Sequence, residues 1–254
     1  MRKATLAPTA SWVVNPVPRP EASWRLFCFP YAGGSASLYN TWPADLAPAV
    51  DVCAVQLPGR ENRLFEPPVA DLPSLIELLA EVLSPSLSMP YAFFGHSMGA
   101  LISFELARYL AEQACLVPAH LFISAHRAPQ LPGRRSPLHT LSDAALLQEL
   151  QRFQGASAAA FAEDELMALM LPALRADFRL CETYKYTPGP PLACPISVFG
   201  GRNDRDIGYA ELAAWRGQTS QGFALRLLPG DHFFLHRQRA ALLQAISEDL
   251  AHLH

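Results

Sequence analysis

Short, almost uninterrupted apolar runs alternate along this chain with longer stretches whose apolar residues recur at helical spacing. The runs predict strands at Trp24–Phe29, Asp51–Gln56, Tyr91–Phe94, His120–Ser124, Ile196–Phe199 and Phe223–Leu228, with Ser11–Val14 as an added edge strand. Runs without polar alternation are typical of parallel strands covered on both faces. The helical stretches fall at Leu72–Leu83, Gly99–Glu112, Ile207–Gln218 and Gln238–Leu250. The alternation predicts an α/β fold with a mostly parallel central sheet flanked by helices.

Residues 128–191 break this alternation. Prolines bracket the segment, and between them the pattern is helical. Ser142 is a candidate cap for one helix, a Gly/Ala/Ser stretch follows at 155–160, and a second helix is expected near 163–170, where Pro172 must kink it or begin a new one. We expect one domain, residues 1–254, with a helical lid inserted at 128–191. The alternative is an ordinary helical subdomain without a gating role.

Composition narrows the class of protein. The 254 residues are half apolar, which is enough for one large core, and the net charge of −3 includes no basic stripe, so nucleic acid is not an expected partner. No apolar run is long enough to cross a bilayer, and the N-terminus lacks the apolar region of a secretory signal. The five scattered cysteines are expected to be buried, reduced thiols. We therefore expect a cytoplasmic protein without membrane contact, and nothing demands more than a monomer.

The stretch Gly95-His96-Ser97-Met98-Gly99 lies between a predicted strand and a predicted helix. This context is that of a nucleophile elbow, a sharp turn that lifts a serine hydroxyl above the sheet edge. Side chains at both flanks would be too large for such a turn, hence the glycines. The following helix directs its N-terminal N–H groups at the serine, with Met98 as the expected oxyanion donor. Ser97 is therefore the candidate nucleophile, although a glycine-rich turn that merely contains a serine remains the alternative.

A serine hydroxyl needs a general base, and the base needs an orienting acid. On a sheet with this elbow the chain order is serine, acid, histidine. We favour Asp204, which comes soon after the predicted strand Ile196–Phe199 and a Gly-Gly turn, over its rival Asp206, which lies two residues further on. Both aspartates could instead only cap the next helix. His232 follows the last predicted strand and is the candidate base.

The other histidines fit less well. His96 lies in the elbow and cannot easily reach the hydroxyl that follows it, and His236 would point elsewhere if a helix begins just before it. His120 and His139 follow no fitting strand, while His126 precedes the predicted insertion and is out of order. The loop Phe29-Pro30-Tyr31-Ala32-Gly33-Gly34 is the candidate source of a second oxyanion amide. No group has metal-ligand spacing along the sequence, so no metal is implied.

Over nearly the whole chain, these motifs resemble the type II thioesterases that accompany polyketide and nonribosomal peptide synthetases. Besides the elbow and the loop at 29–34, the matching stretches are Gln56-Leu57-Pro58-Gly59-Arg60-Glu61-Asn62-Arg63, Leu171-Pro172-Ala173-Leu174-Arg175-Ala176-Asp177-Phe178 and Pro229-Gly230-Asp231-His232-Phe233-Phe234. The resemblance implies the α/β-hydrolase fold. It also implies a nucleophile at Ser97, an acid at Asp204, a base at His232 and oxyanion amides at Met98 and Ala32.

The resemblance further implies a thioesterase that hydrolyses acyl groups from the phosphopantetheine arm of acyl or peptidyl carrier proteins, as an editing enzyme. The arm belongs to the substrate, so no cofactor of the enzyme's own is expected. The chain departs from the family at His126, where a small residue is expected and the shape of the acyl chamber is affected. It departs again at Asp231, which replaces a more usual glycine and would perturb the base or cap a turn.

Two questions stay open at this stage. Arg60, Glu61 and Arg63 either order the loop beneath the lid, which we prefer, or touch an acidic carrier protein. The same elbow and triad would also suit a generic carboxylesterase or lipase-like hydrolase, because fold does not fix substrate. A hydrolase-like module that binds carrier proteins without catalysis is the third possibility.

Overall fold

The computed structural model describes residues 12–133, 137–154 and 164–253. A seven-stranded sheet has the order β1-β3-β2-β4-β5-β6-β7, in which β2 to β7 are parallel and β1 pairs antiparallel with β3. The strands are β1 (Val13–Val14), β2 (Trp24–Phe29), β3 (Val50–Val55), β4 (Tyr91–His96), β5 (His120–Ser124), β6 (Ile196–Gly201) and β7 (Phe223–Leu228). All six predicted strands and the mostly parallel sheet are confirmed. The predicted edge strand is two residues long, and Ser11 lies outside the described residues.

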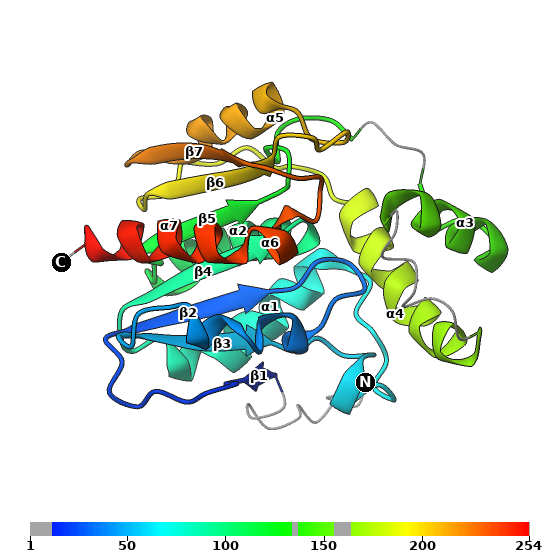
Figure 1. Ribbon diagram of the computed structural model, residues 1–254, viewed down its shortest axis with the longest axis horizontal. Helices are drawn as coiled ribbons and strands as arrows, with labels where there is room; N and C mark the ends of the chain where they lie inside the picture. The colour runs from blue at the N-terminus through cyan, green and yellow to red at the C-terminus, as the bar shows by residue number, and fades with distance from the viewer. Residues whose placement is uncertain (1–11, 134–136, 155–163, 254) are drawn as a thin grey trace.

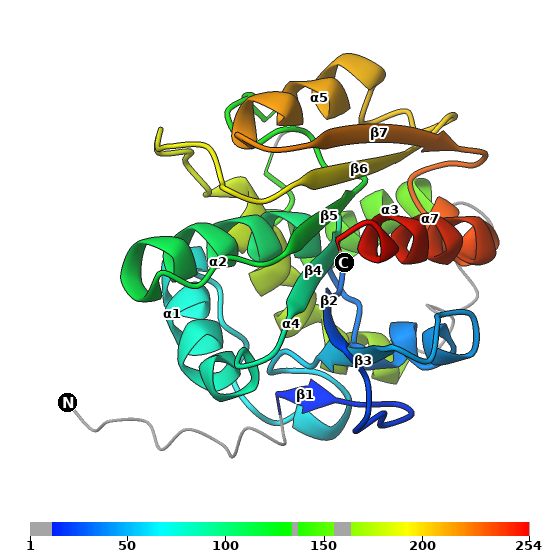
Figure 2. The same ribbon diagram turned by 90° about the vertical axis from the view of Figure 1, so that its left-hand side faces the viewer.

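Helices cover both faces of the sheet (Figures 1 and 2). They are α1 (Leu72–Leu83), α2 (Met98–Ala114), α3 (Asp143–Gln154), α4 (Asp164–Glu182), α5 (Tyr209–Ala213), α6 (Phe234–Arg237) and α7 (Arg239–Ala251). One buried cluster joins the sheet to α1, α2 and α5 and includes Phe93, Phe104 and Trp215. A second joins the opposite face to α7 and includes Trp42, Phe122 and Ile246. The fully apolar strands predicted this two-sided burial.

The predicted helix 207–218 is wrong as a single α-helix. It is divided into α5 and a following 3-10 segment, Ala214–Gln218. Trp215 in that segment is fully buried, and its ring nitrogen donates to the backbone oxygen of His126 at 2.8 Å. The 3-10 segment carries this anchor, which helical periodicity alone did not indicate.

The cysteine prediction holds for Cys28, Cys53 and Cys194, which are buried free thiols. Cys181 is only partly buried, and Cys115 is exposed, so the prediction is wrong for Cys115. Cys115 follows the last residue of α2 in the left-handed conformation, with φ 53°. A helix end of this kind turns the chain outward, and the thiol is therefore left at the surface.

The helices α3 and α4 lie together beyond one end of the sheet, on the right in Figure 1. They belong to the predicted insertion, and α4 continues through Pro172 as one helix. Ser142 caps α3 as predicted, because its hydroxyl accepts a hydrogen bond from Ala145 N at 3.3 Å. The Gly/Ala/Ser stretch at 155–160 and the predicted helix start at Glu163 lie outside the described residues.

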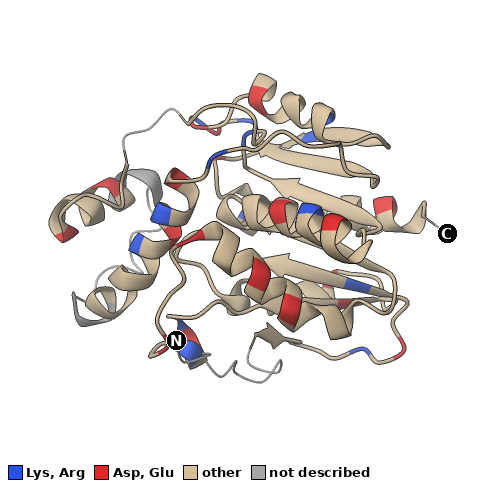
Figure 3. Ribbon diagram, turned by 180° about the vertical axis from the view of Figure 1, so that it is seen from behind, with Lys and Arg blue, Asp and Glu red and all other residues tan. Residues whose placement is uncertain are grey.

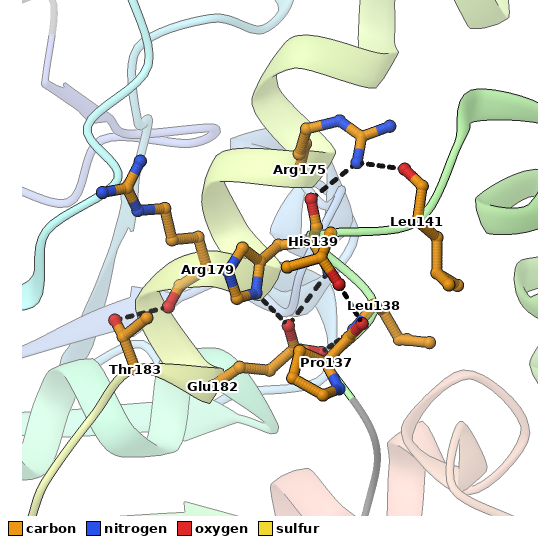
Figure 4. Close-up of polar contacts among 9 residues, drawn as sticks. Pro137, Leu138, His139, Leu141, Arg175, Arg179, Glu182 and Thr183 are labelled. Atoms are coloured by element: carbon orange, nitrogen blue, oxygen red, sulfur yellow. Dashed lines mark hydrogen bonds and ion pairs between the residues drawn. The ribbon is translucent and has the colours of Figure 1, made fainter.

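Polar contacts hold the segment before α3 against α4 (Figure 4). The Glu182 carboxylate accepts hydrogen bonds from Leu138 N at 2.8 Å, His139 N at 3.0 Å and His139 Nδ1 at 2.6 Å. Arg175 donates to the backbone oxygens of His139 and Leu141 at 2.6 and 2.7 Å. These bonds satisfy backbone groups that no helix or strand pairs, so the two described helices of the insertion are held together.

Charges of both signs are interspersed over the molecule, and no basic stripe crosses the residues coloured by charge in Figure 3. Among the described residues, no helix has the length and apolar character that crossing a membrane requires.

Candidate active site

The elbow is a strained turn. Ser97 lies between β4 and α2 with φ 52° and ψ −113°, a region that L-residues rarely occupy. Its backbone N–H donates to Ser124 O at the end of β5, 2.8 Å away. Because β4 and β5 are neighbouring parallel strands, this bond holds the turn against the carboxyl edge of the sheet. The turn that the local sequence predicts is therefore present, and its backbone geometry exposes the Ser97 side chain.

The two flanking glycines are required for space. A Cβ placed on Gly95 would lie 2.1 Å from Gly99 O, and one placed on Gly99 would lie 2.1 Å from Phe29 O. Neither glycine has a positive φ; the chain simply passes too close for any side chain. The elbow, the start of α2 and the end of β2 are therefore packed backbone against backbone.

Three side chains that are distant in sequence meet at this turn. His232 Nε2 lies 3.1 Å from Ser97 Oγ, and His232 Nδ1 lies 2.8 Å from Asp204 Oδ2. The Asp204 side chain is 1% exposed and that of His232 is 20% exposed. An ionised carboxylate can only accept, so Nδ1 carries the proton and Nε2 is free to accept from the serine hydroxyl. This is the arrangement that nucleophilic acyl transfer needs.

Asp204 accepts the 2.8 Å hydrogen bond from His232 Nδ1, as the preference for it over Asp206 predicts. Its second oxygen, Oδ1, accepts from Asp206 N at 2.8 Å and Ile207 N at 3.3 Å. The capping alternative is wrong for Asp204, because α5 has its N-cap at Gly208; the Asp204 carboxylate instead holds the turn before α5 and orients His232. Donor and acceptor atoms of Asp204, Asp206 and His232 lie within 4.8 Å of one another. The linear spacing did not show this cluster, but both nitrogens of His232 are already engaged by Ser97 and Asp204.

The remaining candidate histidines have other partners. His96 Nδ1 lies 2.8 Å from Ser124 Oγ, and burial holds the pKa of His96 well below its usual value. His236 Nε2 lies 3.1 Å from the Tyr31 hydroxyl, and His139 bonds to Glu182. His120 lies 2.9 Å from Ser197 Oγ.

Both residues at which the chain departs from the family, His126 and Asp231, have a hydrogen-bond partner in the structure. His126 Nδ1 lies 2.7 Å from Arg127 O, and burial lowers the pKa of His126 to about 3, so it is a neutral, buried imidazole. Asp231 Oδ1 accepts from Phe233 N at 2.9 Å. Asp231 therefore caps the turn that carries His232, which is one of the two roles foreseen for it.

The oxyanion-loop candidates lie beside the elbow. β2 and β4 are paired with Phe29 opposite Gly95, so the loop 30–34 leaves its strand next to Ser97. Met98 is the first residue of α2, and its N–H is one of the four at a helix start that no intrahelical carbonyl can satisfy. Ala32 N–H lies one residue before Gly33, whose N–H binds Asp177.

The polar support of this loop was only partly foreseen. Arg60 forms a buried ion pair with Asp177, which agrees with the preferred ordering role for Arg60. Asp177 itself and fully buried Gln56, whose side chain accepts from Ala36 N at 2.7 Å, were missed. A signal for Asp177 existed, because a carboxylate three residues after Leu174 lies on the apolar face of its helix.

Comparison with known proteins agrees with this geometry. The family profile described as a thioesterase domain matches residues 24–250. Gramicidin S biosynthesis protein GrsT of Aneurinibacillus migulanus is 43% identical over 239 residues, 94% of this chain and 93% of that protein. The solved structure of BorB, a type II thioesterase from the borrelidin biosynthetic cluster, is 40% identical with a TM-score of 0.88, covering 99% of this chain and 100% of that one.

Linear gramicidin dehydrogenase LgrE of Brevibacillus parabrevis is 45% identical over 253 residues, 98% of this chain and 96% of that protein. Despite that name, this chain has no Gly-x-Gly-x-x-Gly run for a dinucleotide, and a serine elbow follows its β4. Family profile, relatives and fold agree with one another. The chain belongs to the thioesterase family, as a type II thioesterase with the α/β-hydrolase fold that hydrolyses thioesters.

Proposed function

We propose that this enzyme hydrolyses acyl groups from the phosphopantetheine arm of carrier proteins of a polyketide or nonribosomal peptide synthetase, with Ser97, His232 and Asp204 as its catalytic residues. The observation that carries the residue roles is the hydrogen-bond chain from Asp204 through His232 to Ser97 Oγ on a strained elbow. The substrate class is supported by the relatives, because GrsT is named for gramicidin S biosynthesis and BorB for the borrelidin cluster.

The chemistry follows from the contacts. Ser97 Oγ attacks the thioester carbonyl while His232 Nε2 takes the hydroxyl proton, and the imidazolium is stabilised by Asp204. The N–H groups of Met98 and Ala32 bind the oxyanion. A thiol is far more acidic than an alcohol, with a pKa of about 8.5 for cysteine, so the pantetheine sulfur leaves readily and takes the proton from His232. Water, deprotonated by His232, then attacks the acyl-serine and releases the free acid and Ser97.

The helical insertion is proposed to act as the lid of the acyl site. The position of the insertion supports this role, because Ala32 packs against the core and also against the insertion's own apolar cluster. That cluster consists of Leu138, Leu146, Leu150 and Leu174. We propose that the protein is a single-domain monomer. We also propose that it requires no cofactor of its own, because the triad supplies the nucleophile, the base and the orienting acid. The arm on which the acyl group arrives is part of the substrate.

The test is acid release from acyl-carrier protein and from acyl-pantetheine, with wild type compared with Ser97→Ala. We expect turnover to fall by about 10⁴-fold or more in the variant. Equal rates would reject Ser97 as the nucleophile. Matched oxygen esters separate the esterase alternative, which requires that esters be preferred and that the carrier protein have no effect.

A serine-reactive phosphonate separates catalysis from carrier binding alone. We expect one adduct, located at Ser97 by mass spectrometry. Carrier binding without an adduct, under conditions that label a known serine hydrolase, would favour the non-catalytic module.

A further inference from the structure

A buried carboxylate on the helical insertion reaches the loop that follows β2. Asp177 on α4 is 2% exposed, and its Oδ2 accepts a hydrogen bond from Gly33 N at 2.8 Å. Arg60 binds both carboxylate oxygens, with Nη2 2.8 Å from Oδ1 and Nη1 2.9 Å from Oδ2. Arg60 Nη1 also donates to Gly34 O at 3.0 Å. One ion pair between insertion and core thus holds the loop at two successive residues.

The hydrogen bond to Gly33 fixes the form of a β-turn. Gly34 N donates to Tyr31 O at 2.8 Å, which closes a four-residue turn from Tyr31 to Gly34. Its third residue, Gly33, has φ +75°, the value that a type II turn requires. Type I and type II turns differ in the orientation of the central peptide, here Ala32–Gly33. The N–H of that peptide belongs to Gly33 and donates the hydrogen bond to Asp177.

The same turn directs the amide of Ala32. In a trans peptide the C=O and N–H point in opposite directions. With Tyr31 O bound to Gly34 N inside the turn, Ala32 N–H must point out of it. The turn starts one residue after Pro30, and Phe29 is packed directly against the elbow glycine Gly99. The Tyr31–Gly34 bond therefore sets the direction of the Ala32 amide next to Ser97, and the bond from Gly33 N to Asp177 holds that turn in its place and form.

Two glycines make room for α4 at this position. A Cβ on Gly33 would lie 2.9 Å from Leu174 Cδ1, and a Cβ on Gly59 would lie 3.1 Å from the Cβ of Ala173. Both glycines have positive φ, +75° and +83°. The helix is thus seated on two loops of the core, close enough for Asp177 to enter between them.

We propose that Asp177 is a positioning residue for the oxyanion hole, which acts by holding Gly33 N–H so that the turn aims the Ala32 amide at the reacting carbonyl. This inference rests on the proposed function, in which Ala32 is an oxyanion donor. Because the acceptor comes from α4, seating of the insertion and completion of the oxyanion hole are one event. A displaced insertion leaves the triad assembled but the oxyanion unsupported.

The experiment compares Arg60→Met/Asp177→Asn with Arg60→Met/Asp177→Leu. Both variants remove the ion pair and have similar volume, so neither leaves a buried charge unpaired. Only the asparagine retains an oxygen that accepts from Gly33 N. Loss of one oxyanion donor lowers kcat by about 10²–10³-fold, so we expect the leucine variant to be at least about tenfold slower than the asparagine variant.

Two readouts separate positioning from mere stability. We refer kcat to the active sites counted by complete phosphonate labelling, and we expect KM to change less than about threefold. A trifluoromethyl ketone analogue, which forms an oxyanion on Ser97, should lose affinity by the same factor as kcat/KM.

Asp143→Asn is the matched control, because it breaks the exposed 2.5 Å ion pair of Asp143 with Arg175 without touching the turn. Equal kcat per titrated site in the two double variants, or a loss of kcat without a loss of ketone affinity, overturns the proposal.

A measurement on the wild type does not depend on whether the variants fold. Coupling between sites is reciprocal, so an oxyanion that binds the Ala32 amide should stabilise the seating of α4. We expect slower hydrogen exchange at residues 173–180 with the trifluoromethyl ketone than with its methyl ketone counterpart. Equal exchange with both overturns the proposal. If Ser97→Ala keeps its turnover, the proposed function fails; if only the double variants are equal, only this inference fails.

Discussion

At the scale of single residues, function in this enzyme is tied to unfavourable local conformation. Ser97 has φ 52° and ψ −113°, and its side chain is the one that His232 reaches. Strain of this kind costs about 1–3 kcal/mol and persists only where the surroundings enforce it. Here the enforcement comes from the bond of Ser97 N to Ser124 O and from the tight passage past Gly99.

Ser97→Gly should therefore raise the free energy of unfolding while it abolishes turnover. Glycine accepts this φ freely but loses more entropy on folding, so we expect a net gain of about 1 kcal/mol over Ser97→Ala. Ser97→Ala is the matched control, because it removes the hydroxyl but keeps the Cβ. Urea unfolding measures the difference, and a glycine variant no more stable than the alanine variant would contradict the strain.

A buried histidine at the opposite edge of the sheet should make stability depend on pH. Burial lowers the pKa of His120 to about 4, below the value of about 6.5 for an unfolded histidine. Between these values the unfolded chain binds the proton and the folded one does not. The contribution of His120 is therefore complete above pH 6.5 and lost as the pH falls toward 4, on the order of 3 kcal/mol in all.

We expect His120→Asn to flatten the fall in unfolding free energy between pH 6.5 and pH 4. His252→Asn is the control, because it makes the same substitution at an exposed position. Urea unfolding at a series of pH values gives both slopes. Parallel curves for wild type and His120→Asn would show that His120 does not contribute this dependence.

At the scale of elements, the site depends on how closely α2 approaches β2. The helix start and the strand end meet at Gly99, where a Cβ would lie 2.1 Å from Phe29 O and 2.8 Å from Pro30 O. Phe29 cannot retreat easily, because its strand is paired on both sides, with β3 and with β4. One contact thus sets the separation between Ser97 and the loop that contains Ala32.

Gly99→Ala should destabilise the enzyme by about 3 kcal/mol or more, because backbone cannot move aside as a side chain can. Gly217→Ala is the matched control. A Cβ there meets nothing within 4 Å, and we expect a change within about 0.5 kcal/mol. Urea midpoints measure both variants. Equal stabilities would mean that the helix shifts away from β2 without loss.

At the scale of the whole molecule, the parallel sheet gathers the site at one edge. Ser97 follows β4, Asp204 follows β6 and His232 follows β7, while the loop with Ala32 follows β2. Parallel strands place all their carboxyl ends on the same side, and the strand order brings these four ends together. The helical insertion adds Asp177 from outside the sheet.

The two neighbouring aspartates should then differ sharply in their effect. We expect Asp204→Asn to lower kcat by about 10⁴-fold, because the amide disturbs the tautomer and orientation of His232. Asp206→Asn changes the same functional group two residues away and should lower kcat less than about threefold, since Asp204 supplies the bond to Nδ1. Thioester hydrolysis by the two variants decides this. Equal losses would mean that the pair acts as a unit.

The strands, the elbow and the chain order of Ser97, Asp204 and His232 could all be predicted from the amino-acid sequence. These depend on short-range properties: apolar runs, the need for glycine beside Ser97, and the fixed chain order of serine, acid and histidine on this sheet. Where the local pattern was ambiguous, the tertiary structure decided. The buried anchor Trp215 lies in a 3-10 segment in place of the predicted helix, and Cys115 is exposed at a helix end.

Only the tertiary structure gave the support of the oxyanion loop. Arg60 and Asp177 are separated by 117 residues, and neither position alone indicates the other as its partner. A buried charge must find a partner, but which one depends on how α4 packs over two loops with glycines at their closest points. Local sequence pattern specifies an element and its exposed face, whereas contacts between distant elements are settled by packing of the whole chain.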